Sequence, residues 1–412
     1  MKKSLIVIII LLAATSCAKK MSKEEIIVAQ LKQEIVQDLT ENILANWAKY
    51  SPDPLGGFYG ALNFDWSPRE NASKGGILNA RLLWTYSAAY RILKDEQYLK
   101  LANRAQEYFL DHFIDPIYGG SFYTVTATGE PLAMQKDTYQ NAFAIYGLSE
   151  HYRATGNKES LDAAIAIYRK FAEHVYDPIN GGFIQSFDRE WNMIEVRSPK
   201  TMNTNLHVLE ALTNLYRVWK DDDLREKLKQ EIYVMSNKVL NQATWHEQLY
   251  LTMDWQNQRE DDSYGHDIEF SWLLVEAAEV LGDEEILKDT KRIAVNLVDV
   301  QLKEGVDEKG AMMYEKAGER LITNLQWWVQ AETIVGCLNA WQITGDGKYV
   351  DAAVRQWEWI KTYMIDYKYG EWFGNVNPDG TPRPNDIKAD QWRCPYHNSR
   401  MGFEVMTRFP HL

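Results

Sequence analysis

One turn motif recurs at a fixed interval along the first half of this chain. Asp-Pro followed closely by Gly-Gly begins at Asp53, Asp115 and Asp177, so the successive starts are 62 residues apart. Weaker versions of the same turn follow at 250–254, 307–310 and 366–372. Six turn clusters at intervals of about sixty residues indicate an internal repeat, in which each unit folds against its neighbours.

Between the turns, apolar residues recur at helical spacing, and each interval holds two helices. The predicted helices span 24–48, 76–93, 97–112, 138–155, 158–174, 203–219, 222–240, 266–281, 283–300, 326–344, 347–365 and 398–408. Joints such as 154–158 and 343–347 contain a Gly that can end one helix and an Asn or Asp that can cap the next.

Six helix pairs can bury their apolar faces by closing into a ring. We therefore predict an all-α fold, an (α/α)6 barrel with short hairpin-like turns at one rim; an open solenoid is the alternative. Nothing between residues 21 and 412 resembles a Pro- or Ser-rich linker, so this range is predicted to be a single domain.

The first twenty residues have the pattern of an export signal. Lys2 and Lys3 precede an apolar run over 5–14, which is too short to span a bilayer but suits a signal-peptide core. The run leads to Cys17, and the segment resembles a bacterial lipoprotein signal in which this cysteine carries the lipid. We predict export and lipid anchoring at the cell envelope. An uncleaved anchor and an ordinary signal peptide are the alternatives.

Charge and cysteine content exclude several classes of protein. The formal charge of −13 disfavours nucleic-acid binding, because an acidic surface repels the phosphate backbone. After Cys17 only Cys337 and Cys394 remain, which make no disulfide framework and no Cys-x-x-Cys zinc motif. These two can pair only if the fold brings them within bridging distance.

Every second predicted helix carries conspicuous polar or aromatic residues near its beginning. They are Arg81, Tyr139, Asn141, Asn203, His207, His266, Glu269, Trp327 and Trp328, with His397 just before the last helix. In a closed ring these alternate helices form the inner layer and start at the same rim. The sequence therefore predicts that these residues converge on one pocket, where helix N-termini also favour developing negative charge.

Each of these residues has a simpler structural interpretation. A histidine or a tryptophan pair on an apolar helix is often part of the core, and Arg81 alone could be a buried ion-pair member. The spacings His207-x-x-Glu210 and His266-x-x-Glu269 place imidazole and carboxylate on one helix face, where the carboxylate can fix the tautomer. Three histidines could instead bind zinc, but no His-Glu-x-x-His motif is present, so no metal is predicted.

Adjacent carboxylates at Asp261 and Asp262 are a competing signal. In an (α/α)6 barrel they could act as the acid and the nucleophile or base of a glycoside hydrolase. The simpler alternative is that they are solvated or cap the following helix.

Four segments resemble the N-acylglucosamine 2-epimerase superfamily, and more closely its cellobiose 2-epimerase branch, which includes mannobiose 2-epimerase-like members. The resemblance runs from about residue 30 to the end. The segments are Trp392-Arg-Cys-Pro-Tyr-His-Asn-Ser-Arg400, Lys200-x-x-Asn-x-x-x-His207, Gly265-His-Asp-x-Glu-x-x-Trp272 and Trp327-Trp-x-Gln-Ala-Glu332. The branch is typically cytoplasmic, so the predicted export departs from its pattern.

The resemblance implies a sugar 2-epimerase that inverts C2 of the reducing-end residue of β-1,4-linked disaccharides such as cellobiose and mannobiose. It assigns His266 and His397 to the acid–base pair, and Arg81 and His207 to the carbonyl end. Substrate binding then falls to Tyr139, Asn203, Glu269, Trp392 and one of Trp327 and Trp328.

This chemistry suits the residue types, since histidine is a common base near neutral pH and arginine keeps its charge beside an enediolate. The chemistry calls for no cofactor. The partners expected are the oligosaccharide and a membrane lipid, with the protein as a monomer or weak dimer. The alternatives are a glycoside hydrolase on the same ring and a non-catalytic sugar-binding lipoprotein.

Overall fold

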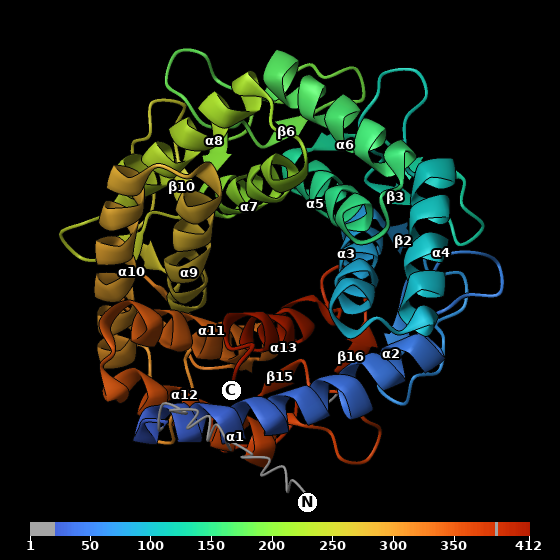
Figure 1. Cartoon of the computed structure of the whole chain (residues 1–412). Coiled ribbons are helices and arrows are strands. Elements are labelled where there is room, and N and C mark those ends of the chain that lie inside the picture. The colour runs from blue at the N-terminus through green and yellow to red at the C-terminus, as the bar shows by residue number, and fades with distance from the viewer. Residues whose placement is uncertain (1–20, 384–385) are drawn as a thin grey trace, which may run out of the picture.

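The helices of the computed structural model alternate between an inner and an outer layer around one axis (Figure 1). The structure describes residues 21–383 and 386–412, so the predicted signal segment with Cys17 lies outside the described residues. The inner helices are α3 (Gly76–Leu93), α5 (Thr138–Thr155), α7 (Met202–Val218), α9 (Tyr264–Leu281), α11 (Trp327–Thr344) and α13 (Tyr396–Arg408). The outer helices are α1 (Lys23–Gln37) with α2 (Leu44–Tyr50), α4 (Glu96–His112), α6 (Lys158–Lys170), α8 (Asp222–Val234), α10 (Glu284–Glu304) and α12 (Gly347–Trp359).

The ring is closed, because α13 packs against both α11 and α3, and α1 packs against α12 and α13. The predicted (α/α)6 barrel is thereby confirmed over the open solenoid. The last helix begins at Tyr396 rather than at 398, so His397 lies inside its first turn and not before it.

The two layers differ in how much of each helix is buried. In the outer helix α4 the buried residues Tyr98, Ala102, Ala105 and Phe109 form a single stripe. In the inner helix α5 every residue over 138–151 is buried. An inner helix therefore packs on all sides, and its polar side chains must find partners inside the protein.

Several outer helices widen at their C-terminal ends into π-helical segments. These segments are Asp38–Ile43, Phe171–Val175, Met235–Val239 and Ile360–Met364. The predicted continuous helices over 24–48, 158–174, 222–240 and 347–365 therefore contain a change of winding that apolar spacing does not reveal.

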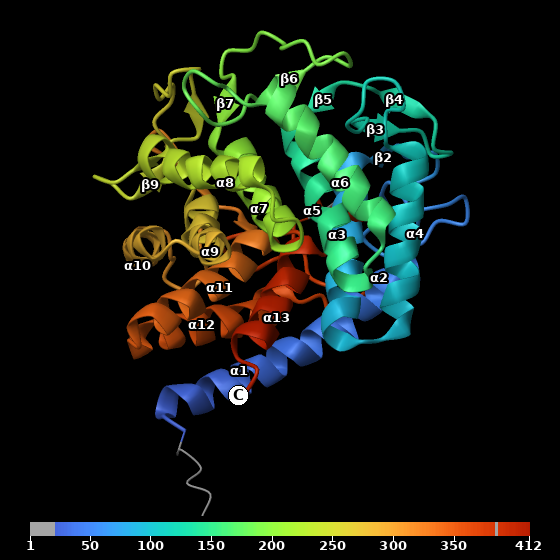
Figure 2. The same ribbon diagram turned by 45° about the horizontal axis from the view of Figure 1, so that its top comes forward.

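Short strands at one rim link consecutive repeats, and the strands labelled in Figure 2 lie at its upper end. The strand before each inner helix pairs with a strand that follows the turn of the next repeat. These pairs are β2 (Lys74–Gly75) with β3 (Thr124–Val125), β5 (Lys136–Asp137) with β6 (Ser186–Phe187), β7 (Lys200–Thr201) with β10 (Tyr250–Leu251), β11 (Asp261–Asp262) with β12 (Glu315–Ala317), β14 (Leu325–Gln326) with β15 (Asn375–Val376), and β16 (Ile387–Ala389) with β1 (Leu62–Asn63). The remaining strands complete local hairpins: β4 (Pro131–Ala133), β8 (Leu240–Asn241), β9 (His246–Glu247) and β13 (Arg320–Ile322).

A buried ion pair holds most of the recurring turns. The turn aspartate accepts from a lysine that stands just before or in the strand leading to the inner helix. The pairs and their Nζ–Oδ distances are Lys74–Asp53 (2.8 Å), Lys136–Asp115 (2.9 Å), Lys200–Asp177 (2.8 Å) and Lys388–Asp366 (2.7 Å). The corresponding position is Asp262 in one of the two remaining repeats and Leu325 in the other, so neither repeat has a lysine there.

Three tryptophans each form a hydrogen bond from one turn to the preceding turn. Trp66, Trp191 and Trp255 adopt left-handed backbone conformations, with φ of 69°, 67° and 67°. Trp191 donates its indole N–H to Tyr118 and Trp255 donates to Asn180. Trp66 makes the equivalent bond across the closure, to the carbonyl of Tyr369 at 2.8 Å.

In the part of the chain that the structure describes, Cys337 and Cys394 form no disulfide, and no helix could span a membrane. Within the described residues, Cys337 and Cys394 are both buried free thiols. Over 21–383 and 386–412, every helix is too short or too polar to cross a bilayer.

Replacing Lys200 with alanine tests the buried ion pairs. The change leaves Asp177 buried without its cation, so we expect a loss of about 3–5 kcal/mol in the free energy of unfolding, measured in urea. Lys170→Ala is the control, because Lys170 pairs with Glu173 on the surface at 2.9 Å and should contribute less than about 1 kcal/mol. Equal losses in the two variants would contradict the structural importance of the buried pair.

Candidate active site

The predicted site residues that the structure describes, except Asn141, line one cavity at the strand-bearing rim. Its volume is about 240 Å³. The lining residues are Arg81, Tyr139, Asn203, His207, His266, Glu269, Tyr314, Gln326, Trp327, Trp328, Trp392 and His397. Every inner helix contributes at least one of them, so closure of the ring assembles the cavity.

Arg81 on α3 is a buried cation with an unusual environment. Its guanidinium donates to the Tyr139 hydroxyl at 2.6 Å and to the Trp392 carbonyl at 3.3 Å. The guanidinium carbon lies 4.3 Å from the Phe143 ring centre and 4.9 Å from that of Tyr396. Burial opposes the charge, but Tyr139 and the other surrounding groups outweigh it and raise the pKa of Arg81. The side chain therefore offers a fixed positive charge to an oxyanion in the cavity.

His397 on α13 is held by a carboxylate from a neighbouring inner helix. Its Nδ1 lies 2.8 Å from Oε1 of Glu332 on α11. A proton on Nδ1 then points at the carboxylate and leaves Nε2 as the basic nitrogen. Burial, followed by the positive charges of Arg400 and Arg81, lowers the pKa of His397 well below its usual value. The imidazole is consequently neutral near pH 7 and can accept a proton.

His266 on α9 is positioned differently. Its Nδ1 lies 2.6 Å from the hydroxyl of Ser263, and its ring packs against Trp328 with centroids 4.8 Å apart. The preceding Gly265 permits this approach, since a Cβ there would come within 2.7 Å of the Trp328 ring. Burial, with a smaller contribution from His207, lowers the pKa of His266 to about 3.

The two predicted His-x-x-Glu pairs have different outcomes. His207 contacts Glu210 at 2.9 Å, as its spacing on α7 indicates. His266 and Glu269 do not pair, because the cap residue Ser263 holds the imidazole while Glu269 turns to Arg400. Glu269 instead lies 3.7 Å from His397.

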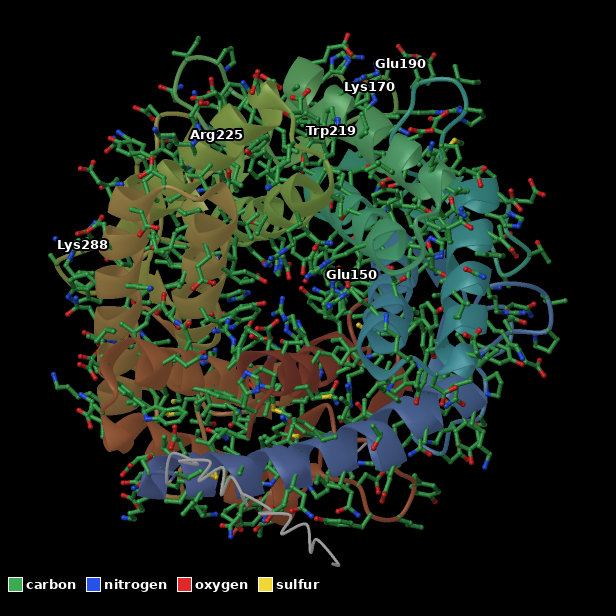
Figure 3. The ribbon with its side chains drawn as sticks, in the orientation of Figure 1. Glu150, Lys170, Glu190, Trp219, Arg225 and Lys288 are labelled. Atoms are coloured by element: carbon green, nitrogen blue, oxygen red, sulfur yellow. The ribbon has the colours of Figure 1, made fainter. Side chains whose placement is uncertain are left out.

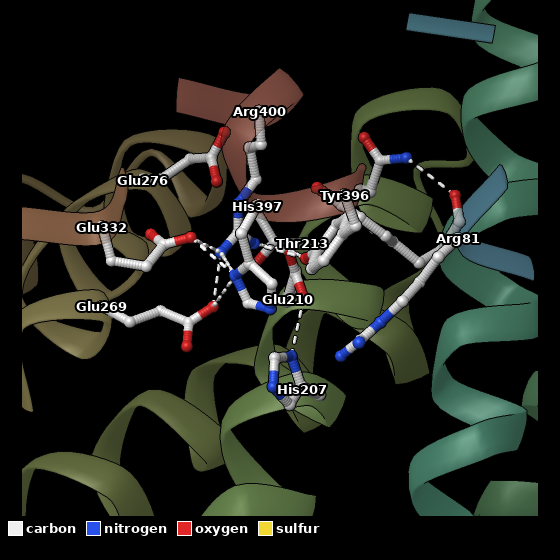
Figure 4. A network of polar contacts seen from close by, with 12 residues as sticks. Arg81, His207, Glu210, Thr213, Glu269, Glu276, Glu332, Tyr396, His397 and Arg400 are labelled. Carbon is white, nitrogen blue, oxygen red and sulfur yellow. Dashed lines mark hydrogen bonds and ion pairs between the residues drawn. The ribbon is translucent and has the colours of Figure 1, made fainter. Parts of the chain in front are cut away.

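Arg400 on α13 joins the carboxylates behind the site (Figure 4). Its guanidinium donates to Glu210, Glu269 and Glu332, each of which comes from a different inner helix. Burial and the neighbouring Glu332 raise the pKa of Glu269 to about 7. Burial acts in the same direction on Glu210, but Arg400 and His207 overcome it and lower the pKa of Glu210 to about 2.

Sequence reasoning did not assign roles to Arg400, Glu332, Tyr314 or Gln326. Arg400 and Glu332 end two of the motifs that carry the family resemblance, so those motifs could have identified them. Tyr314 lies in the loop before β12 and Gln326 in β14, and neither carries a signal in the sequence. Asn141, which the sequence grouped with the site, points away from the cavity and accepts from the Ser121 amide at 2.7 Å.

One group of side chains has the composition of a metal site. Ligand atoms of Glu269, Glu332 and His397 lie within 4.8 Å of one another. The Arg400 guanidinium already donates to both carboxylates, so the cluster has a cation of its own.

The aspartate pair proposed for hydrolysis is placed on the rim hairpin. Asp261 forms an ion pair with Arg259 at 2.8 Å and accepts from the Gly318 amide at 3.1 Å. Neither Asp261 nor Asp262 is among the described residues that line the cavity. The arrangement therefore gives these carboxylates a structural role in the hairpin.

A second cavity of about 260 Å³ adjoins the first. The two share Tyr139, Asn203, His266, Tyr314 and Trp392. The second extends outward to polar side chains, among them Asp137, Gln185, Thr201, Tyr250 and Glu315. Together they form a cleft with a deep charged end and a shallower polar end.

Comparison with known proteins gives consistent similarities. Residues 57–399 match the family model described as N-acylglucosamine 2-epimerase. The chain is 43% identical over 387 residues to the cellobiose 2-epimerase of Bacteroides fragilis, covering 91% of this chain and 98% of the relative. It is 37% identical to that of Ruminococcus albus over 91% of this chain and 98% of the relative. The solved structure of cellobiose 2-epimerase from Bacillus thermoamylovorans superimposes with a TM-score of 0.89 at 36% identity, over 92% of this chain and 100% of that one.

Replacing Glu332 with glutamine tests its support of His397. Glutamine keeps the size but removes the charge that fixes the imidazole, so kcat for cellobiose, the substrate in the relatives' names, should fall about 10²-fold. KM should stay within about threefold of wild type, because Glu332 lies behind the cavity wall and not on it.

The matched control is Glu404→Gln, which removes a carboxylate from α13 that is paired with Arg408 at 2.8 Å, away from the cavity. This variant should keep the wild-type kcat. Thermal melting of both variants verifies folding, and a wild-type kcat in folded Glu332→Gln would refute the role assigned to Glu332.

Proposed function

The chain belongs to the N-acylglucosamine 2-epimerase family and is a carbohydrate epimerase, and from this premise we propose that it inverts C2 of the reducing-end sugar of β-1,4-linked disaccharides. The observation that carries the proposal is the convergence of two neutral histidines and one buried arginine on a single cavity. His266 and His397 come from different inner helices and each has one ring nitrogen held by the protein. The other nitrogen of each is free to exchange a proton with a sugar between them.

The reaction follows from these roles. The hemiacetal first opens: O1 loses its proton, the C1–O5 bond breaks and O5 gains a proton. One histidine then removes the proton from C2, and the electron pair forms a C1–C2 double bond while negative charge moves to O1 beside Arg81. The other histidine, which has taken up a proton from solvent, delivers it to the opposite face of C2 and restores the aldehyde with inverted configuration; the first histidine returns the abstracted proton to solvent, and the ring closes.

The second cavity supports a disaccharide rather than a monosaccharide. The deep cavity holds the histidines and Arg81, and suits the reacting sugar. Trp392 lines both cavities and is 49% exposed, so its ring offers a stacking surface where the two meet. The polar side chains of the outer cavity can hydrogen-bond the second sugar.

Incubation of the protein with cellobiose and, separately, with β-1,4-mannobiose in D2O tests this function by NMR. We expect the C2 epimer with deuterium at C2 and an intact glycosidic bond. His266→Ala and His397→Ala should each lower the rate by about 10²-fold or more, since each removes one proton-transfer group.

Asp261→Asn is the control that separates epimerisation from hydrolysis, and it should leave epimer formation unchanged. Released monosaccharide, lost in Asp261→Asn, would favour a glycoside hydrolase. Binding without any change in either sugar would favour a non-catalytic sugar-binding protein.

We also propose that the protein is exported and lipid-anchored through Cys17 at the cell envelope, and that it acts as a monomer or weak dimer. The basic start, short apolar run and cysteine of the first twenty residues support the anchor.

Replacing Cys17 with serine tests the anchor. Wild-type protein from a bacterial host should fractionate with membranes and incorporate labelled fatty acid, whereas Cys17→Ser should lose the label. Cys337→Ser is the control and should keep it. Equal labelling of wild type and Cys17→Ser would exclude lipidation at this residue.

A further inference from the structure

A further cavity, separate from the two at the strand-bearing rim, lies at the opposite end of the barrel, where the inner helices end. Its volume is about 510 Å³, which exceeds that of the deep sugar cavity. We call it the far mouth; residues that line it include Arg91, Arg153, Arg217, Glu276, Asn339 and Arg408. Figure 3 shows Glu150, which pairs with Arg91 and Arg153, at this central opening.

The far mouth is basic on a protein of strongly acidic composition. Arg91, Arg153, Arg217, Lys291 and Arg408 line it, against three lining carboxylates. The whole chain has a formal charge of −13, so this gathering of cations does not follow from composition.

The helix dipole alone does not explain these arginines. Helix C-termini are negative and attract cations, which then commonly donate to the last main-chain carbonyls. In the described chain the hydrogen-bond acceptors of the far-mouth arginines are side chains and not main-chain carbonyls. These arginines are Arg91, Arg153, Arg217 and Arg408.

Most of the guanidinium N–H groups in the far mouth make no hydrogen bond to the described protein. A guanidinium carries five N–H groups. Within the described residues Arg91 donates only through Nε, to Glu150 at 2.6 Å, and Arg217 only through Nη2, to Glu276. Arg153 makes one long contact of 3.4 Å with Glu150. Donors in fixed forks that face a polar cavity are suited to an oxyanion.

The buried side chain of Asn339 is a second, independent indication of a ligand in the far mouth. It is 2% exposed, and its Oδ1 accepts from Arg408 at 3.0 Å. Its Nδ2 has no hydrogen-bond partner within 21–383 and 386–412. A buried amide donor left unpaired at the wall of a cavity is costly, and an acceptor in the far mouth could satisfy it.

We propose that the far mouth binds a phosphate group, through Arg91, Arg153 and Arg217. The phosphate can be free, or it can belong to a phospholipid headgroup, because the first described helix starts at this end. Glu24 lies beside Gly347, and Lys32 donates to the carbonyls of Phe409 and Leu412 at 2.6 and 3.0 Å. Cys17 precedes Lys23 by six positions in the sequence, so a lipid on Cys17 would hold this end near the membrane; the headgroup source rests on that proposal.

Thermal melting with inorganic phosphate, at constant ionic strength set by chloride, tests the site. We expect a saturable rise in Tm of about 2 °C. Arg153→Gln should raise the phosphate concentration for the half-maximal shift about tenfold, because it removes a charge-assisted donor while disturbing only one long contact. Arg292→Gln, an exposed arginine that pairs with Asp289, is the matched control and should melt like wild type in phosphate.

Two further measurements distinguish phosphate in the far mouth from phosphate in the sugar cavity, and a phospholipid headgroup from free phosphate. Arg81→Gln should keep the phosphate shift; loss of the shift there, with retention in Arg153→Gln, would place phosphate in the sugar cavity and overturn the proposal. Absence of any saturable shift in wild type, together with no binding to phosphatidylglycerol vesicles, would also overturn it. Co-sedimentation with those vesicles over phosphatidylcholine vesicles, weakened in Arg153→Gln, would identify the headgroup as the source.

Discussion

The site depends on one guanidinium shared by three buried carboxylates. Arg400 on α13 reaches Glu210 on α7, Glu269 on α9 and Glu332 on α11. Each buried charge alone would be costly, and the cluster is tolerable only because every carboxylate has a cationic or hydrogen-bonded neighbour. The same contacts fix the relative positions of four inner helices. Since Glu210 holds His207 and Glu332 holds His397, the charge cluster also sets the direction of the imidazoles in the cavity.

The rim and the interior of the barrel have different structural roles. At the rim, buried lysine–aspartate pairs and short strands join one repeat to the next, and these residues recur because every joint has the same geometry. The side chains that the inner helices present to the cavity differ from helix to helix, such as Arg81 on α3, Tyr139 on α5 and Trp327 on α11. A repetitive scaffold therefore presents a non-repetitive set of side chains, which is what an asymmetric sugar requires.

Sequence predicted the helices and the convergence of the site residues well, because both follow from periodicity. Apolar spacing marks the outer helices most clearly, and a closed ring forces the starts of alternate helices to one rim, whatever residues they carry. Periodicity could not show that the hydroxyl of Ser263, three residues upstream, contacts the His266 imidazole, while Glu269 accepts from Arg400. Nor could it show the π-helical ends or the contribution of Tyr314, since these depend on contacts between residues distant in sequence.

The pairing of β1 with β16 sets how this barrel can fold. Leu62 pairs with Ala389, and Trp66 bonds to Tyr369, so the contacts that close the ring join the two ends of the repeat array. An open solenoid gains stability repeat by repeat, but a ring is incomplete until its last unit docks on its first. Such long-range closure makes folding slow and cooperative. Arg81 and His397 lie on opposite sides of that seam, so a partly synthesised or partly unfolded barrel has no active site at all.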